Sequence, residues 1–225
     1  MRCEILSLMA RSALASAIKE AVKLRFAPLL RDEGFRKQGT DFYLRAGECT
    51  GLVNVQSSMR NTCSLSRFTL NLGRYFPAID AAMAQEWTPP RAERWSIKIY
   101  NCQLRRQIGE FFPPYRDFWW EVTPESDVDD LAAQLADVWQ QYGAPWMKRT
   151  LDLREAVSDL EAQGMYWDAA AGRLVLGEPE EASRLARAFV QSVTTTEHTH
   201  PVATAIDEKY LKQIQGWCAR HELEM

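Results

Sequence analysis

Two stretches, LVNVQSS at residues 52–58 and RFTLNLG at residues 67–73, alternate apolar with polar side chains. Successive residues of a β-strand point to opposite faces of a sheet. An alternating pattern of this length is typical of strands with one buried face. The two stretches therefore predict one core face and one polar face, with the core face carrying Val53, Val55, Phe68, Leu70 and Leu72.

A hairpin is the simplest way to join these strands, with residues 59–66 as its loop. This register pairs Asn54 with Asn71 and Gln56 with Thr69 on the polar face, because residues directly opposite each other share a face. The two strands thus predict a row of amide and hydroxyl side chains outside the core.

Further elements follow on both sides of this hairpin. Residues 12–32 have apolar residues at helical spacing, with Gly34 at the place of a C-terminal cap and a kink or restart expected at Pro28. Short strands are expected between turns at residues 39–41 and 46–48, and again at residues 96–109 and 118–123. Residues 76–94 predict a short helix and a Pro-rich turn.

From Pro124 onward the pattern is helical, with Ser126 as the expected first cap and Gly143 as the expected stop before Pro145. We therefore predict an α+β fold, in which about five antiparallel strands are packed by an N-terminal helix and followed by an acidic helical C-terminal section. Residues 9–147 form the α+β domain, and residues 148–225 form the helical section, packed on the first part as one unit.

Charge is distributed unevenly along the chain. Residues 1–112 hold 17 Lys and Arg against 10 Asp and Glu, whereas residues 113–225 hold 10 against 20. Neither half is basic enough to indicate a nucleic-acid partner. Five scattered cysteines without a CxxC pair indicate reduced thiols, and the N-terminal apolar stretch is too interrupted by charge for a signal sequence or a membrane span. We expect a cytoplasmic protein without a membrane anchor.

Trp119 and Trp120 are neighbours in the last predicted strand, so they cannot both enter one core unless the strand is bulged. We expect one indole under the N-terminal helix. The other lies under the C-terminal helices or at the edge of a groove between them and the sheet.

The runs GFRKQGTDFY, NVQSS, FTLNLGRY, LRRQIGEFFPPYRDFWWEV and APW together resemble a bacterial family whose domain has no assigned function. The resemblance covers about residues 9–147. It implies an intracellular bacterial α+β domain and carries no activity. Some uncharacterised families of this size are immunity proteins against toxins, which is an association and not an inference from residues.

No catalytic motif, cofactor motif or metal site is predicted. Glu197, His198 and His200 are the densest group of metal-ligand types, but without a third clear ligand they are interpreted as a polar loop. Asp117 and Glu121, four residues apart in a strand, are interpreted as ion-pair partners rather than as an acid–base pair.

The predicted polar face remains as the candidate binding surface, with a solvated sheet face as the alternative interpretation. Its candidate residues are Asn54, Gln56, Thr69, Asn71, Arg74, Arg105, Asp117 and Trp119. We expect a non-enzymatic protein that binds a protein partner, as an immunity protein or an adaptor does. The competing hypothesis is an enzyme or a small-molecule binder that uses a groove beside this face; the oligomeric state stays open.

Overall fold

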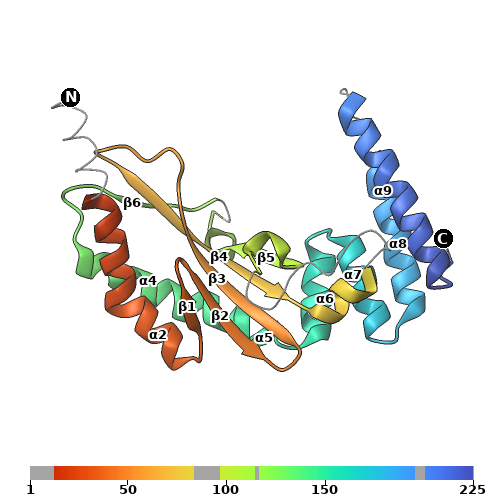
Figure 1. The fold of residues 1–225 in the computed structure, drawn as a ribbon, viewed down its shortest axis with the longest axis horizontal. Helices are drawn as coiled ribbons and strands as arrows, with labels where there is room; N and C mark the ends of the chain where they lie inside the picture. Colours follow the sequence, from red (N-terminus) through yellow and green to blue (C-terminus); the bar gives the residue numbers. More distant parts are fainter. Residues whose placement is uncertain (1–12, 84–96, 115–116, 196–200, 225) are drawn as a thin grey trace. The chain divides into compact units, whose positions relative to one another are not determined.

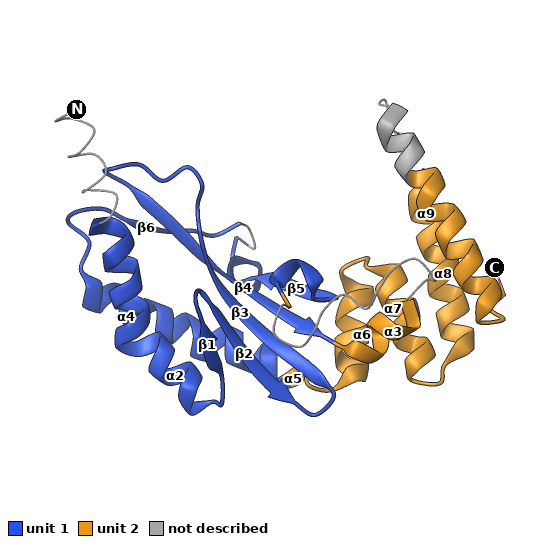
Figure 2. Cartoon of the chain, in the orientation of Figure 1, with its two compact units in different colours: residues 1–75, 98–148 blue, residues 76–97, 149–225 orange. Residues whose placement is uncertain are grey.

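The computed structural model describes residues 13–83, 97–114, 117–195 and 201–224. The chain forms two compact units, residues 1–75 with 98–148 and residues 76–97 with 149–225 (Figure 2). Residues 76–97 thus belong to the second unit, although the sequence-based prediction attached them to the first. That the helical section packs on the first part as one folding unit stays a prediction.

Unit 1 contains a six-stranded antiparallel sheet (Figure 1). Five strands follow one another in the order β1-β2-β3-β4-β5, and β6 pairs with β4. Their bounds are β1 Arg36–Gln38, β2 Asp41–Ala46, β3 Cys49–Ser57, β4 Ser66–Tyr75, β5 Leu104–Gln107 and β6 Trp120–Val122. The α+β class with its antiparallel sheet is confirmed. The predicted register is also confirmed, since Asn54 lies opposite Asn71 and Gln56 opposite Thr69.

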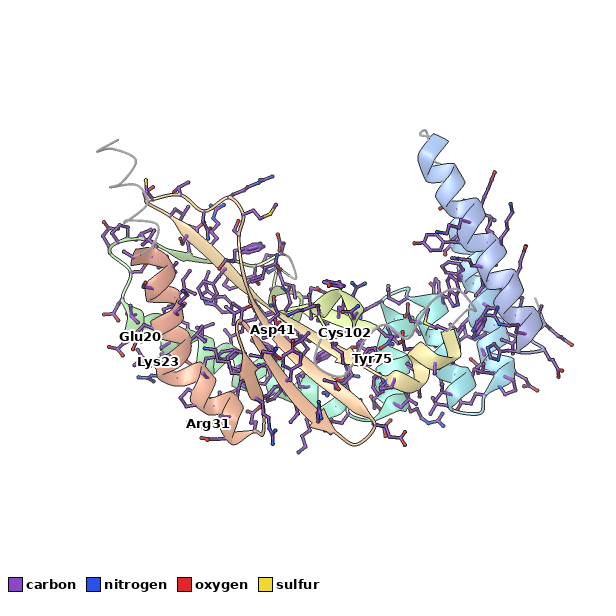
Figure 3. All side chains as sticks on the ribbon, in the orientation of Figure 1. Glu20, Lys23, Arg31, Asp41, Tyr75 and Cys102 are labelled. Carbon is purple, nitrogen blue, oxygen red and sulfur yellow. The ribbon has the colours of Figure 1, made fainter. Side chains whose placement is uncertain are left out.

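One face of the sheet is covered by helices. Residues 13–21 are helical and continue through η1 (Val22–Phe26) into α2 (Ala27–Asp32), and the second helical run consists of α4 (Val128–Val138), η4 (Trp139–Gly143) and α5 (Ala144–Arg149). Phe26 contacts both Phe42 of β2 and Trp139, with ring centroids 5.8 Å apart in each case. We call this the helix-covered face. Glu20, Lys23 and Arg31 lie on the exposed side of the first helix (Figure 3).

Both helical runs continue through a proline, at Pro28, where the sequence predicted a kink or restart, and at Pro145, where it predicted that the helix had already stopped. A π-helical turn precedes each Ala-Pro pair, so Ala27 N–H donates to Val22 O, and Ala144 N–H donates to Trp139 O. The wider turn changes the backbone pairing just where proline has no N–H to donate. The expected helix stop at Gly143 is therefore wrong.

Two other local expectations change, and a third is confirmed. Asp127, rather than Ser126, caps α4, because its carboxylate accepts from Asp129 N–H and Asp130 N–H. Residues 96–109 are not one strand: η2 (Ile99–Asn101) precedes β5, and η3 (Ile108–Phe111) follows it. Gly34 does end the first helix, with φ of 93°.

Unit 2 is helical in its described residues, and its helices are α3 Pro77–Met83, α6 Leu153–Ala162, α7 Tyr166–Val175, α8 Pro179–Thr195 and α9 Pro201–Arg220. Trp217 of α9 is fully buried and donates from Nε1 to Ala82 O at 2.7 Å, which ties α9 to the end of α3. No helix in the described ranges is long and apolar enough to cross a membrane.

Candidate functional site

A single line of polar residues crosses five strands on the face of the sheet opposite the helices. Gln38 lies opposite Asp41, Asp41 opposite Asn54, Asn54 opposite Asn71, and Asn71 opposite Gln107. We call these five residues the polar row and the face that carries them the polar face. Since neighbouring strands are ~4.8 Å apart, the row spans roughly 19 Å.

Hydrogen bonds order the side chains of the polar row. Asn54 Nδ2 donates to Asp41 Oδ1 at 2.5 Å, and Asn71 Nδ2 donates to Gln56 Oε1 at 2.6 Å. Gln56 is exposed, and Asn54 and Asn71 are half-buried. The amides are thus held in fixed orientations at the surface. Binding a partner to these ordered amides would therefore cost less side-chain entropy than binding it to amides that are free to rotate.

Asp41 is the buried centre of a second cluster on this face (Figure 3). Its Oδ2 accepts from Tyr43 Oη at 3.2 Å and from Lys98 Nζ at 2.8 Å. The hydrogen bond to Asp41 raises the pKa of Lys98, while burial, followed by the nearby Asp41 charge, raises the pKa of Tyr43. Both Asp41 oxygens are occupied, and Lys98 fastens the chain that enters η2 to the sheet.

The segment around η2 covers part of the polar face. Leu52 and Gly73 lie opposite each other beside the polar row, and both are buried. A Cβ atom on Gly73 would lie 2.7 Å from Cys102 Sγ and 2.8 Å from Ile99 Cδ1, so a glycine is needed for this close approach. The polar row is therefore the accessible line next to this cover.

Asp117 lies near the end of the connection between β5 and β6 and is bound to the start of that connection. Both strands pair with the same edge of β4, β5 at residues 71–74 and β6 at residues 66–68. Gln107 Nε2, at the end of β5, donates to Asp117 Oδ1, and Gln107 Oε1 accepts from Phe118 N–H at 2.6 Å. Gln107 and Asp117 thus hold together the two ends of the connection between β5 and β6.

The two neighbouring tryptophans lie on opposite faces. Trp120 is buried on the helix-covered face, where it stacks on Phe68 at 5.3 Å and meets the Phe118 ring edge at 4.8 Å. Continuing the β4–β6 register by one residue places Trp119 opposite Thr69 on the polar face. Trp119 is half-buried and forms no hydrogen bond or ring contact with another described residue.

Thr69 differs from expectation, because it lies on the polar face but is fully buried. Its hydroxyl has no hydrogen-bond partner among the described residues. It sits where β5 has ended and β6 has not begun. Thr69 is therefore buried beneath the polar face and is not available to a partner at the surface.

Arg74 differs more strongly, since it lies on the helix-covered face and not on the polar one. It is opposite Gly51, fully buried, and donates from Nη2 to the carbonyl of Met147 in α5. A Cβ atom on Gly51 would lie 2.7 Å from Arg74 Nη1. Burial lowers the pKa of Arg74, and the nearby Cys49 opposes this shift. Arg74 therefore serves the core and leaves the candidate surface.

Two exposed arginines lie at the ends of the neighbouring row. Arg36 lies opposite Tyr43 at the β1 edge, and Arg105 lies opposite Gly73 at the β5 edge. Arg105 is thus on the polar face, as expected. Farther along, exposed Arg67 pairs with Glu121 across β4 and β6, with Nη2 2.6 Å from Oε1. The surface carries cations at both of its edges.

Sequence reasoning missed Gln38, Asp41, Tyr43, Lys98 and Gln107. The two-residue turn at Gly39 and Thr40 is a signal that would have found the first two, because it forces Gln38 and Asp41 to pair. Nothing local in the sequence indicates Lys98, which is 57 residues from Asp41 along the chain.

No set of three potential metal ligands is found among the residues that the structure describes. Glu197, His198 and His200 fall outside those residues. The candidate residues that come together are Asn54, Gln56, Asn71, Arg105, Asp117 and Trp119, all on the polar face or at its edge.

Comparison with curated proteins and with solved structures found no match. Comparison with family models found one, to residues 26–149. That range includes all six strands and the α4–η4–α5 run, and it ends before the four C-terminal helices. The chain belongs to the family described as a domain of unknown function, DUF4304.

Proposed function

We propose that this chain is a non-enzymatic binding protein of the bacterial cytoplasm that holds a protein partner on the polar face of its sheet, as an immunity protein or an adaptor does. The observation that carries the proposal is the polar row, whose amides are ordered by hydrogen bonds before any partner arrives. Preordered polar groups lower the entropic cost of binding.

Trp119 gives this surface an anchor. Trp119 is half-buried on the polar face, opposite Thr69, and has no partner among the described residues. Tryptophan and arginine are the side chains most often found at the energetic centre of protein interfaces. Met59, in the β3–β4 loop, is completely exposed beyond the Arg67–Glu121 pair, and methionine is also enriched at interfaces.

The acidic helical section is the weaker candidate for the same role. Many of its carboxylates are already paired with arginines of unit 2. Arg184 binds Glu161 and Glu181, while Arg173 binds Glu178 and Glu161. Such a network leaves less uncompensated charge for a partner than the number of acidic residues suggests.

A small-molecule or enzymatic function is the second candidate, and the Asp41–Tyr43–Lys98 cluster is the observation that favours it. A buried carboxylate beside a lysine and a phenol is a combination that acid–base sites use. Here, however, the carboxylate binds Asn54, Tyr43 and Lys98 at once. If the cluster binds a ligand, Lys98→Met should abolish a ligand-induced thermal shift that Arg31→Gln leaves intact.

The test of the proposed function begins with the products of the genes next to this one. Each is purified and titrated calorimetrically into the full chain, into the double variant Asn71→Arg/Trp119→Ala, and into Leu24→Ala as a control. Leu24 is 44% exposed on the first helix and lies away from the polar face. We expect one product to bind the native chain and the control but to bind the double variant at least tenfold more weakly. Equal binding to all three, or no binding by any neighbour, would overturn the proposal.

A further inference from the structure

Asp117 presents an exposed carboxylate at the end of the polar row formed by Gln107. Its Oδ1 accepts from Gln107 Nε2, and Gln107 lies opposite Asn71. Within the described part of the chain, Asp117 forms no ion pair and no other hydrogen bond, so its Oδ2 is not bound. This oxygen is therefore accessible to a cationic group of a partner.

The other charges at this end of the polar face are already engaged. Glu121 forms an ion pair with Arg67, with Nη2 2.6 Å from Oε1. Arg105 lies two residues before Gln107 on β5 and has an interaction of its own. Asp117 is thus the charged group at this end whose interactions leave an oxygen for a partner.

Trp119 places an aromatic ring on the same face as this carboxylate. Asp117 and Trp119 are two residues apart and share one side of an extended chain, whereas Phe118 between them contacts the buried Trp120. Trp119 is half-buried and has no ring contact, hydrogen bond or cation contact with another described residue. The face of an indole attracts a cation that lies within about 6 Å of the ring centroid.

Asn71 supplies a second acceptor close to this ring. Trp119 lies opposite Thr69, and Asn71 follows Thr69 by two residues, which makes Trp119 and Asn71 diagonal neighbours on one face. The Cβ atoms of such neighbours are ~7–8 Å apart, within reach of aromatic and long side chains. Asn71 donates through Nδ2 to Gln56, and its Oδ1 is not bound within the described residues.

An arginine side chain matches this set of groups. Its guanidinium is planar and always charged, stacks on aromatic rings, and carries five N–H donors that can bind two acceptors at once. A lysine ammonium is a compact point charge without a plane to stack. We infer that Trp119, Asp117 and Asn71 bind one arginine side chain of the partner, stacked on the indole and hydrogen-bonded to Asp117 Oδ2 and Asn71 Oδ1. This inference rests on the proposed function and specifies the residue of the partner that the polar face holds.

The probe is N-acetyl-arginine amide, and the readout is the ¹⁵N–¹H resonance of the Trp119 indole, which the variant Trp119→Phe identifies. One cation–π contact and one exposed ion pair are individually weak, so the probe is titrated into the full chain to about 100 mM at constant ionic strength. The control ligands are N-acetyl-citrulline amide, which has a similar shape without the charge, and N-acetyl-lysine amide. We expect arginine to shift the resonance toward saturation, and both controls to bind at least about fivefold more weakly.

Two matched variants isolate the carboxylate. Asp117→Asn keeps a side-chain oxygen for the Gln107 amide but removes the charge, and Asp137→Asn removes the same charge from an exposed position of α4. We expect Asp117→Asn to weaken the arginine probe at least about threefold, and Asp137→Asn to leave it unchanged. Equal binding of the three ligands, an unshifted Trp119 resonance, or equal effects of the two variants would overturn the inference.

The protein partner separates this inference from the proposed function. Calorimetry is repeated with Asp117→Asn and with partner variants in which each exposed arginine is replaced by glutamine. We expect one partner variant to bind at least about tenfold more weakly, and Asp117→Asn to weaken that variant no further, because the two changes remove one shared contact. If the partner loses affinity for Asn71→Arg/Trp119→Ala but no arginine replacement matters, the proposed function stands and the arginine is wrong. If no neighbouring gene product binds while the arginine probe binds as expected, the proposed function falls and the arginine site remains.

Discussion

Arg74 offers the sharpest test of the energetics of unit 1, because a buried cation there has no carboxylate partner among the described residues. Its Nη2 donates to Met147 O, its Nη1 lies 3.8 Å from Cys49 Sγ, and its Nε has no partner within the described part of the chain. Met147 is in the last turn of the α4–η4–α5 run, where backbone carbonyls lack partners within the helix. The helix dipole also favours a cation at this end.

Two replacements separate charge from volume. Arg74→Met keeps most of the volume but leaves the Met147 carbonyl unpaired, which costs ~1–3 kcal/mol. Removal of the buried charge offsets part of that loss, because the desolvation of an ion costs several kcal/mol. We therefore expect a net loss of at most about 2 kcal/mol for Arg74→Met. Arg74→Ala opens a cavity as well, and truncations of large buried side chains cost about 3–5 kcal/mol.

The assay is urea unfolding of the full chain, with labelling of the thiols of Cys49 and Cys102 as the reporter. Both thiols are buried within unit 1 and become reactive when that unit unfolds. If Arg74→Met and Arg74→Ala lose the same stability, the guanidinium bond and not the volume dominates, and the reasoning is refuted. A clear gain for Arg74→Met would instead show that the unpaired carbonyl costs almost nothing.

Three further predictions concern the sheet. Leu70→Ala should cost ~2–5 kcal/mol in denaturant melts, because Leu70 is fully buried, whereas half-buried Asn71→Ala should cost far less; equal losses would contradict the assigned faces. Gly73→Ala should cost ~1–3 kcal/mol of stability and lower the melting temperature by several degrees, because its Cβ would meet Cys102 Sγ; an unchanged melting temperature would show that η2 moves freely. Exposed Cys63 should react with a thiol reagent within minutes at pH 8, but Cys102 only after unfolding, since burial raises the pKa of Cys102 to about 12; mass spectrometry of labelled peptides distinguishes the two.

The sheet could be predicted from sequence where its pairing is local. Alternation over LVNVQSS and RFTLNLG, with residues 59–66 as the loop, was enough to pair Asn54 with Asn71, because a slip by one residue would turn the apolar side chains away from the core. The pairing of β5 with β4 could not be predicted from alternation. Only four residues of β5 are paired, and short helical turns, η2 of three residues before it and η3 of four residues after it, interrupt its alternation. Two of the five residues of the polar row, Asn54 and Asn71, were therefore predicted from sequence, whereas Gln38, Asp41 and Gln107 were not.

The misplacement of Arg74 has a definite physical origin. In the alternation of β4, position 74 follows Leu70 and Leu72 and so belongs to the core face, but a charged residue was expected outside the core. The alternation of β4 predicts the face of Arg74 correctly, whereas the general preference of arginine for the surface does not. The missing information was the helix end at Met147, 73 residues away, which gives the guanidinium a buried acceptor.

Neither Pro28 nor Pro145 ends its helical run, and the same local structure explains both cases and positions the core. Each is preceded by a π-helical turn, and the two turns meet where Phe26 packs edge-on against Trp139. Gly143 permits this, since a Cβ atom there would lie 2.4 Å from the Trp139 ring. A helix that widens instead of ending carries its chain on to Met147, where the last turn covers Arg74. The buried cation, both prolines and five large aromatic rings are thus all accommodated on the helix-covered side of the sheet, which leaves the polar face for the partner that we propose.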